Sequence, residues 1–109
     1  MSEFLPPALL VVNGARHHAE NIQSIIKVNA KGSLRYDCVA TLRSEPQNEH
    51  DPNAIAVMVS DLRVGYISAQ TAQKVKEILG ETPRSLNCTL LWNGNPDLDY
   101  SLYTVQLFG

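Results

Sequence analysis

The chain has 109 residues, 44% of them hydrophobic, which is enough for one globular domain with a modest core. Its formal net charge of −2 argues against a protein that coats nucleic acid by charge alone, because such proteins carry a basic face. No apolar run approaches the roughly 18 residues of a membrane span, and the N-terminus lacks the layout of a signal peptide. We therefore expect a cytoplasmic protein, associated with the nucleoid if it is bacterial.

The first third of the chain predicts two strands around an ambiguous segment. Leu9 to Asn13 is a short apolar strand, and Gly14 permits a tight bend after it. The isoleucines from Ile22 to Ile26 have helical spacing, yet Ile25 to Val28 could equally begin a strand. Tyr36 to Arg43 then alternates between apolar and polar residues, which indicates a strand with one buried face.

The middle of the chain switches from a polar loop to an apolar hairpin. Glu45 to Asn53 contains two prolines and several turn-forming residues, so its polar side chains are displayed on a stiff loop. Ala54 to Val59 follows as the most buried strand candidate. Ser60 and Asp61 form a turn, and Leu62 to Ile67 is the expected hairpin partner.

The last third predicts a helix and two strands. Ser68 is a plausible N-cap for a helix that runs to about Leu79, and Gly80 is its expected stop. Leu86 to Trp92 and Tyr100 to Leu107 are the remaining strands, with turn-forming residues between them.

About six short strands with one clear helix are typical of a small, mostly β barrel. We expect residues 1–8 to be a flexible lead-in and residues 9–109 to form one domain. Cys38 and Cys88 lie in strand-like segments and read as small buried hydrophobes, because a zinc site would need ligands in close pairs. A disulfide between these two cysteines is left open by the sequence.

The polar loop and the hairpin carry a long, ordered motif. It reads Glu45-Pro46-x-Asn48-x-x-Asp51-Pro52-Asn53-Ala54-Ile55-Ala56-Val57, followed by Val64-Gly65-Tyr66-Ile67. This motif resembles a HIRAN domain. Weaker matches extend the resemblance over nearly the whole chain from about Leu10, namely Val12-x-Gly14-x-Arg16-His17-His18 and Tyr103-x-Val105-x-Leu107. The resemblance implies a modified OB-like β-barrel.

The resemblance also implies a function. HIRAN domains of fork-remodelling translocases hold the 3′ end of single-stranded DNA, so the chain is expected to recognise such ends and to recruit a DNA repair or replication-fork-processing activity. In these domains an acidic loop residue receives the 3′-hydroxyl, a basic residue approaches phosphate, and aromatic rings stack on the terminal bases. The implied DNA-binding residues are Arg16, His17, His18, His50, Asp51 and Tyr66.

Three of the implied residues have a structural alternative, and Arg16 could simply be a solvated surface arginine. Asp51 could cap the backbone amide of Asn53, and Tyr66 could pack in the core with its hydroxyl at the edge. The three histidines stand where the end-binding domains carry aromatic rings, and a histidine offers less surface for stacking.

Two other classes of function compete with DNA binding. Catalysis and metal binding are not expected, since the histidines lack ligand spacing and neither a nucleophile motif nor a phosphate loop is present; we therefore expect no cofactor. A protein-interaction module without a nucleic-acid ligand is the stronger rival, because OB-like barrels host many partners. A helicase or nuclease would be a partner or a fused domain. The oligomeric state is open.

Overall fold

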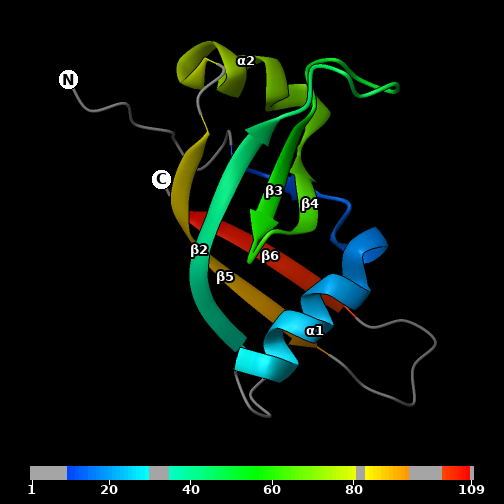
Figure 1. Cartoon of the computed structure of the whole chain (residues 1–109), viewed down its shortest axis with the longest axis vertical. Helices are drawn as coiled ribbons and strands as arrows, with labels where there is room; N and C mark the ends of the chain where they lie inside the picture. The colour runs from blue at the N-terminus through cyan, green and yellow to red at the C-terminus, as the bar shows by residue number, and fades with distance from the viewer. Residues whose placement is uncertain (1–9, 30–34, 81–82, 94–101, 109) are drawn as a thin grey trace.

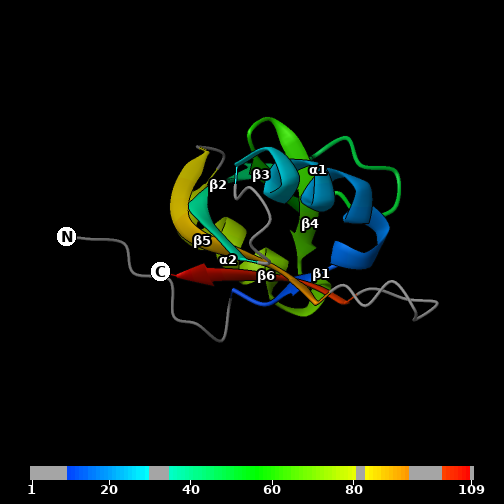
Figure 2. The same cartoon turned by 90° about the horizontal axis from the view of Figure 1, so that it is seen from below.

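The computed structural model describes residues 10–29, 35–80, 83–93 and 102–108, which form an antiparallel sheet and its flanking helices (Figure 1). The strands are β1 (Val12–Asn13), β2 (Arg35–Ser44), β3 (Ile55–Val59), β4 (Leu62–Ile67), β5 (Arg84–Asn93) and β6 (Leu102–Phe108). They are ordered β1-β4-β3-β2-β5-β6. The two outermost strands, β1 and β6, contact each other, so the sheet curls into a nearly closed barrel (Figure 2). The expected small OB-like barrel is confirmed.

The strands follow the predicted hydrophobic pattern. In β2, Ala40 and Leu42 are buried while Val39 and Arg43 are exposed, and four of the five residues of β3 are buried. A two-residue turn joins β3 to β4, with φ angles of 52° at Ser60 and 64° at Asp61. Turns with two positive φ angles match the twist of a hairpin, which is why this polar pair can connect the two strands so tightly.

The ambiguous segment after β1 is helical. A short 3-10 helix, η2 (Ala15–His18), leads into α1 (Ala19–Asn29). Ile22, Ile25 and Ile26 are all nearly fully buried. A strand would send Ile25 and Ile26 to opposite faces, whereas helical spacing puts all three on one face. The strand alternative for Ile25 to Val28 is therefore wrong. The fold has two α-helices, one more than the single clear helix that the sequence predicted.

The predicted helix after β4 is α2 (Ala69–Leu79), which lies at the opposite end of the barrel from α1 (Figure 1). Ser68 occupies the N-cap position, but its side chain makes no cap hydrogen bond; its backbone carbonyl accepts from the amides of Thr71 and Ala72. Gly80 ends the helix with a φ of 66°. Ala72 and Val75 face the core, as predicted.

Some sequence predictions fall on residues outside the described ranges. The lead-in over residues 1–8, the start of the first strand at Leu9 and the start of the last strand at Tyr100 all lie there. Within the described residues the first strand is shorter than predicted, because only Val12 and Asn13 pair with β4.

Candidate functional site

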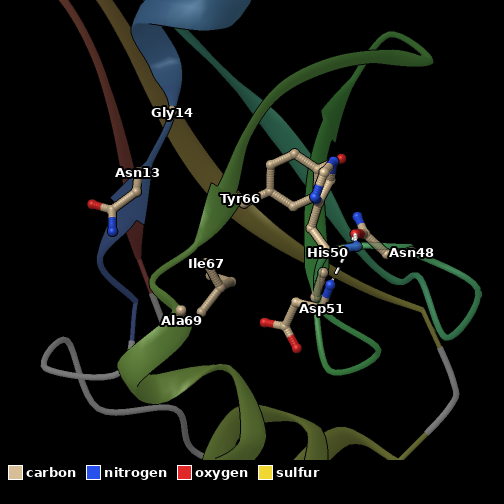
Figure 3. A pocket seen from close by; sticks show the side chains of 9 residues that line it. Asn13, Gly14, Asn48, His50, Asp51, Tyr66, Ile67 and Ala69 are labelled. Carbon is tan, nitrogen blue, oxygen red and sulfur yellow. Dashed lines mark hydrogen bonds between the residues drawn. The ribbon is translucent and has the colours of Figure 1, made fainter.

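A pocket of about 350 Å³ opens where β1, β4, α2 and the loop after β2 meet (Figure 3). Its lining combines apolar atoms with a few polar groups, as is common in ligand-binding pockets. The lining residues are Asn13, Gly14, Asn48, His50, Asp51, Ala54, Tyr66, Ile67 and Ala69.

The loop between β2 and β3 is held by its own hydrogen bonds. The Asn48 Oδ1 atom accepts from the backbone amides of His50 and Asp51, at 2.9 and 3.1 Å. The Asp51 Oδ1 atom accepts from the backbone amide of Asn53 at 2.8 Å, which confirms the turn-capping interpretation of Asp51. Side-chain oxygens that satisfy backbone amides stiffen a turn. The loop is thus a rigid support for its pocket-facing side chains.

The half-buried Asp51 carboxylate points into the pocket (Figure 3). One carboxylate oxygen holds the turn, and among the described residues the other has no hydrogen-bond partner. Ile67 and Ala69 form the apolar side of the pocket across from it (Figure 3). A carboxylate oxygen in this setting can accept a hydrogen bond from a hydroxyl or amine that enters the pocket.

A second carboxylate, Glu45, lies at the base of the same loop and links three side chains. Its Oε1 atom accepts from the Tyr66 hydroxyl at 3.0 Å and from the Asn48 side-chain amide at 3.1 Å. Its Oε2 atom is ion-paired with the Arg63 guanidinium. Glu45 therefore joins the loop to β4, the strand that carries Tyr66.

These contacts shift two pKa values. Burial raises the pKa of Glu45, but the hydrogen bonds from Asn48 and Tyr66 and the charge of Arg63 outweigh burial and hold this pKa below its ordinary value. Burial and the hydrogen bond to Glu45 raise the pKa of the Tyr66 hydroxyl. Glu45 is thus the charged acceptor and Tyr66 the neutral donor of this pair.

Two further groups surround the Tyr66 ring. The ring of His18 lies 5.9 Å from it between centroids, tilted by 56°, and the Arg63 guanidinium carbon is 5.5 Å from its centroid. The Nδ1 atom of His18 is 2.9 Å from the carbonyl oxygen of Gly14, which orients the imidazole. His18 thus supports Tyr66 from the side of η2.

The six residues proposed from sequence are only partly brought together. His50, Asp51 and Tyr66 line the pocket, and His18 contacts Tyr66. His17 is exposed and borders a separate hollow beside η2 and α1, together with His18. Arg16 belongs to η2, but its side chain lies outside what the structure describes.

Several residues of the site are absent from the sequence prediction. Asn48 and Glu45 belong to the motif itself, and their position within it was the signal for a role. Asn13 and Arg63 carried no such signal, because their place depends on the pairing of β4 with β1 and with β3. The Asn21 side chain donates to the backbone carbonyl of Arg63 at 2.8 Å, which ties α1 to the same strand.

Neither a metal cluster nor a membrane-spanning helix occurs in the part of the chain that the structure describes. No three His, Cys, Asp or Glu residues there come together in a group that could hold a metal ion. Neither of the described α-helices is long and apolar enough to cross a membrane.

Comparison with known proteins gives a family. The family model described as HIRAN domain matches residues 14–101, which is most of the chain. The matched region includes η2, the polar loop and the β3–β4 hairpin, and hence nearly all of the pocket. No curated protein and no solved structure matches the chain significantly.

Proposed function

The chain belongs to the HIRAN domain family, whose members are DNA-binding modules, and on this basis we propose that its pocket binds the 3′ end of single-stranded DNA. A pocket of about 350 Å³ is of the size that holds a small ligand or the end of a longer one. It suits the terminal nucleotide of a strand better than the continuous backbone of a duplex.

The observation that carries the proposal is the Asp51 carboxylate in the pocket. One of its oxygens holds the loop, while the other has no partner among the described residues and can accept from a 3′-hydroxyl. A carboxylate at this point would repel a 3′-phosphate or an internal phosphate, so it would discriminate a free end from the rest of the strand. Rigid support from Asn48 places the charge before the ligand arrives.

The rings around the pocket supply the second part of the proposal. Tyr66 lies in the lining, with His50 at the exposed rim of the loop (Figure 3). Stacking of a base on an aromatic side chain is worth roughly 1–3 kcal/mol and tolerates any sequence. We assign Tyr66 and His50 to the terminal bases, and Arg16, His17 and His18 to the phosphates and bases that precede them.

The domain itself would act by binding, without catalysis. Its role would be to deliver a strand end to a repair or fork-processing activity on a helicase or nuclease, either as a partner protein or as a fused domain. This assignment follows from the binding character of the family and from the absence of catalytic motifs in the sequence.

The test is fluorescence anisotropy with a short labelled strand that carries a free 3′-hydroxyl, beside the same strand with a 3′-phosphate. We expect the 3′-phosphate to weaken binding by at least tenfold. Asp51→Asn should weaken binding to the hydroxyl strand and reduce the preference between the two strands. Asp61→Asn is the matched control, because it makes the same charge change in the β3–β4 turn, where asparagine tolerates the positive φ.

The outcomes separate the candidate functions. Equal binding of both strands would remove the role given to Asp51 and leave a general single-strand binder. No binding of either strand by the folded protein would overturn the proposal in favour of a protein-interaction module.

A further inference from the structure

Two cysteines lie side by side on neighbouring strands of the barrel, and neither lines the pocket beside Tyr66. In the antiparallel pairing of β2 with β5, Cys38 is directly opposite Cys88. Both are free thiols. Residues directly opposite each other in an antiparallel pair share one face of the sheet, so both sulfur atoms lie on the same side of the wall.

We infer that Cys38 and Cys88 form an oxidation site at which a hydroperoxide converts the two thiols into a cross-strand disulfide. Directly opposite residues of an antiparallel pair have Cα atoms about 4.5 to 5.5 Å apart. Disulfides span Cα separations of about 4.4 to 6.8 Å. The bond can therefore form without a change in the register of β2 and β5. This inference does not depend on the proposed DNA binding.

The two thiols differ in access. Cys38 is half-buried, and both cysteines border a hollow of about 480 Å³ together with Asp37 and Thr89. Cys88 is only 2% exposed. The neighbouring Cys88 thiol lowers the pKa of Cys38, while the Cys38 thiol and burial raise the pKa of Cys88. Cys38 is therefore the thiol that an oxidant reaches first and the one that ionises more readily.

Oxidation of the two thiols requires one molecule of hydrogen peroxide and no other reagent. The Cys38 thiolate attacks one oxygen of hydrogen peroxide, the O–O bond breaks, and water leaves after protonation, which gives a sulfenic acid on Cys38. The Cys88 sulfur then attacks the Cys38 sulfur, the S–S bond forms, the S–O bond breaks, and the hydroxyl leaves as water with the Cys88 proton. The two thiols lose two electrons, and the peroxide is reduced to two water molecules.

The expected consequence is a more stable barrel. The bond would close the long segment from residue 39 to residue 87, which contains β3, β4 and α2. Disulfides over loops of this length typically raise the Tm of a domain of this size by about 10 °C or more.

The experiment treats the purified protein with a small excess of hydrogen peroxide and then blocks remaining thiols with a maleimide under denaturing conditions. We expect an intact mass that falls by two hydrogen atoms, no maleimide addition, and a protease-generated peptide pair that joins Cys38 to Cys88. The Tm should rise by about 10 °C and return on addition of a reductant.

Cys38→Ser and Cys88→Ala are the matched variants, and neither should show the rise in Tm. The wild-type mass measurement needs no variant, so the inference can be tested even if a variant at the buried Cys88 fails to fold. Disulfide-linked dimers, a gain of oxygen atoms on Cys38, or two thiols that remain open to the maleimide after treatment would each overturn the inference.

Discussion

At the scale of single residues, Glu45 explains how the loop and β4 act as one unit. Its carboxylate accepts from Tyr66 and Asn48 and pairs with Arg63, so three side chains from two segments share one acceptor. The hydrogen-bonding capacity of a half-buried carboxylate is met only while all of its donors, charged and neutral, remain in position. The orientation of the Tyr66 ring in the pocket thus depends on a residue that does not line it.

The substitution Tyr66→Phe separates the contribution of the hydroxyl from the contribution of the ring. Loss of the hydrogen bond to Glu45 should lower the free energy of unfolding by about 1 kcal/mol, because a half-buried acceptor loses one donor. The ring that would stack on a base remains, so DNA affinity should fall much less than in Tyr66→Ala, for which we expect a loss of 1–3 kcal/mol. Urea unfolding and anisotropy measure the two effects, with Tyr36→Phe on β2 as the control. Equal affinities for Tyr66→Phe and Tyr66→Ala would exclude stacking.

The lowered pKa of Glu45 predicts a contribution to stability that depends on pH. A carboxyl whose pKa is lower in the folded than in the unfolded state binds fewer protons when folded. Its stabilising effect is full above the unfolded value of about 4.3 and is lost as pH falls through the lower folded value. Wild type should therefore exceed Glu45→Gln in stability at pH 7, and the gap should narrow below about pH 4.

Urea unfolding of both proteins between pH 7 and pH 3.5 measures this gap. Glu77→Gln is the control, because the exposed pair of Glu77 with Lys74 should contribute little at any pH. A gap between wild type and Glu45→Gln that stays constant over this range would show that the charge of Glu45 is not what stabilises the loop.

At the scale of elements, the pocket depends on how closely β1 approaches β4. A Cβ atom at Gly65 would lie 2.6 Å from the Val12 side chain and 3.0 Å from the backbone oxygen of Asn13. The amide of Ser68 donates to the carbonyl of Val11 at 2.7 Å, so β1 is also tied to the start of α2. The Gly-Tyr pair of the motif thus brings β1 against the strand that presents Tyr66.

Gly65→Ala should force β1 away from β4. The two close contacts involve a β-branched side chain and backbone, neither of which yields easily, so we expect a loss of 1–3 kcal/mol in the free energy of unfolding and weaker DNA binding. Gly14→Ala is the comparison, because nothing lies within 4 Å of its Cβ position and its cost comes from a φ of 80°. Gly65→Ala with wild-type stability would mean that β1 can shift without cost.

These elements show which features the sequence could predict. The β3–β4 hairpin and the β2 strand followed from turn residues and alternation, which are local signals. The helical state of Ile25 to Val28 depended on burial of both Ile25 and Ile26, which only packing reveals. Likewise, the motif pointed to Asp51 and Tyr66, whereas the contacts of Arg63 and Asn13 with the site arise from strand pairing.

At the scale of the whole molecule, charge limits how the protein can hold DNA. Nine Lys and Arg residues against eleven Asp and Glu give a net charge of −2, so no general attraction draws a polyanion to the barrel. Affinity must then come from one place on the surface. An end-binding pocket meets this requirement, since it needs only the last one or two phosphates together with stacking and a hydroxyl contact.

Binding through one or two phosphates in an end-binding pocket predicts that DNA affinity depends only weakly on salt and on strand length. Each phosphate neutralised on a single strand contributes about 0.7 to the slope of log affinity against log salt, so one or two contacts give a slope of roughly −1. Strands of six and twenty nucleotides with the same 3′ end should bind about equally, and a circular single strand should not compete. Anisotropy from 50 to 300 mM salt, with circular DNA as competitor, measures both. A slope of −3 or steeper, or effective competition by the circle, would place the binding energy along the backbone and contradict an end-binding pocket.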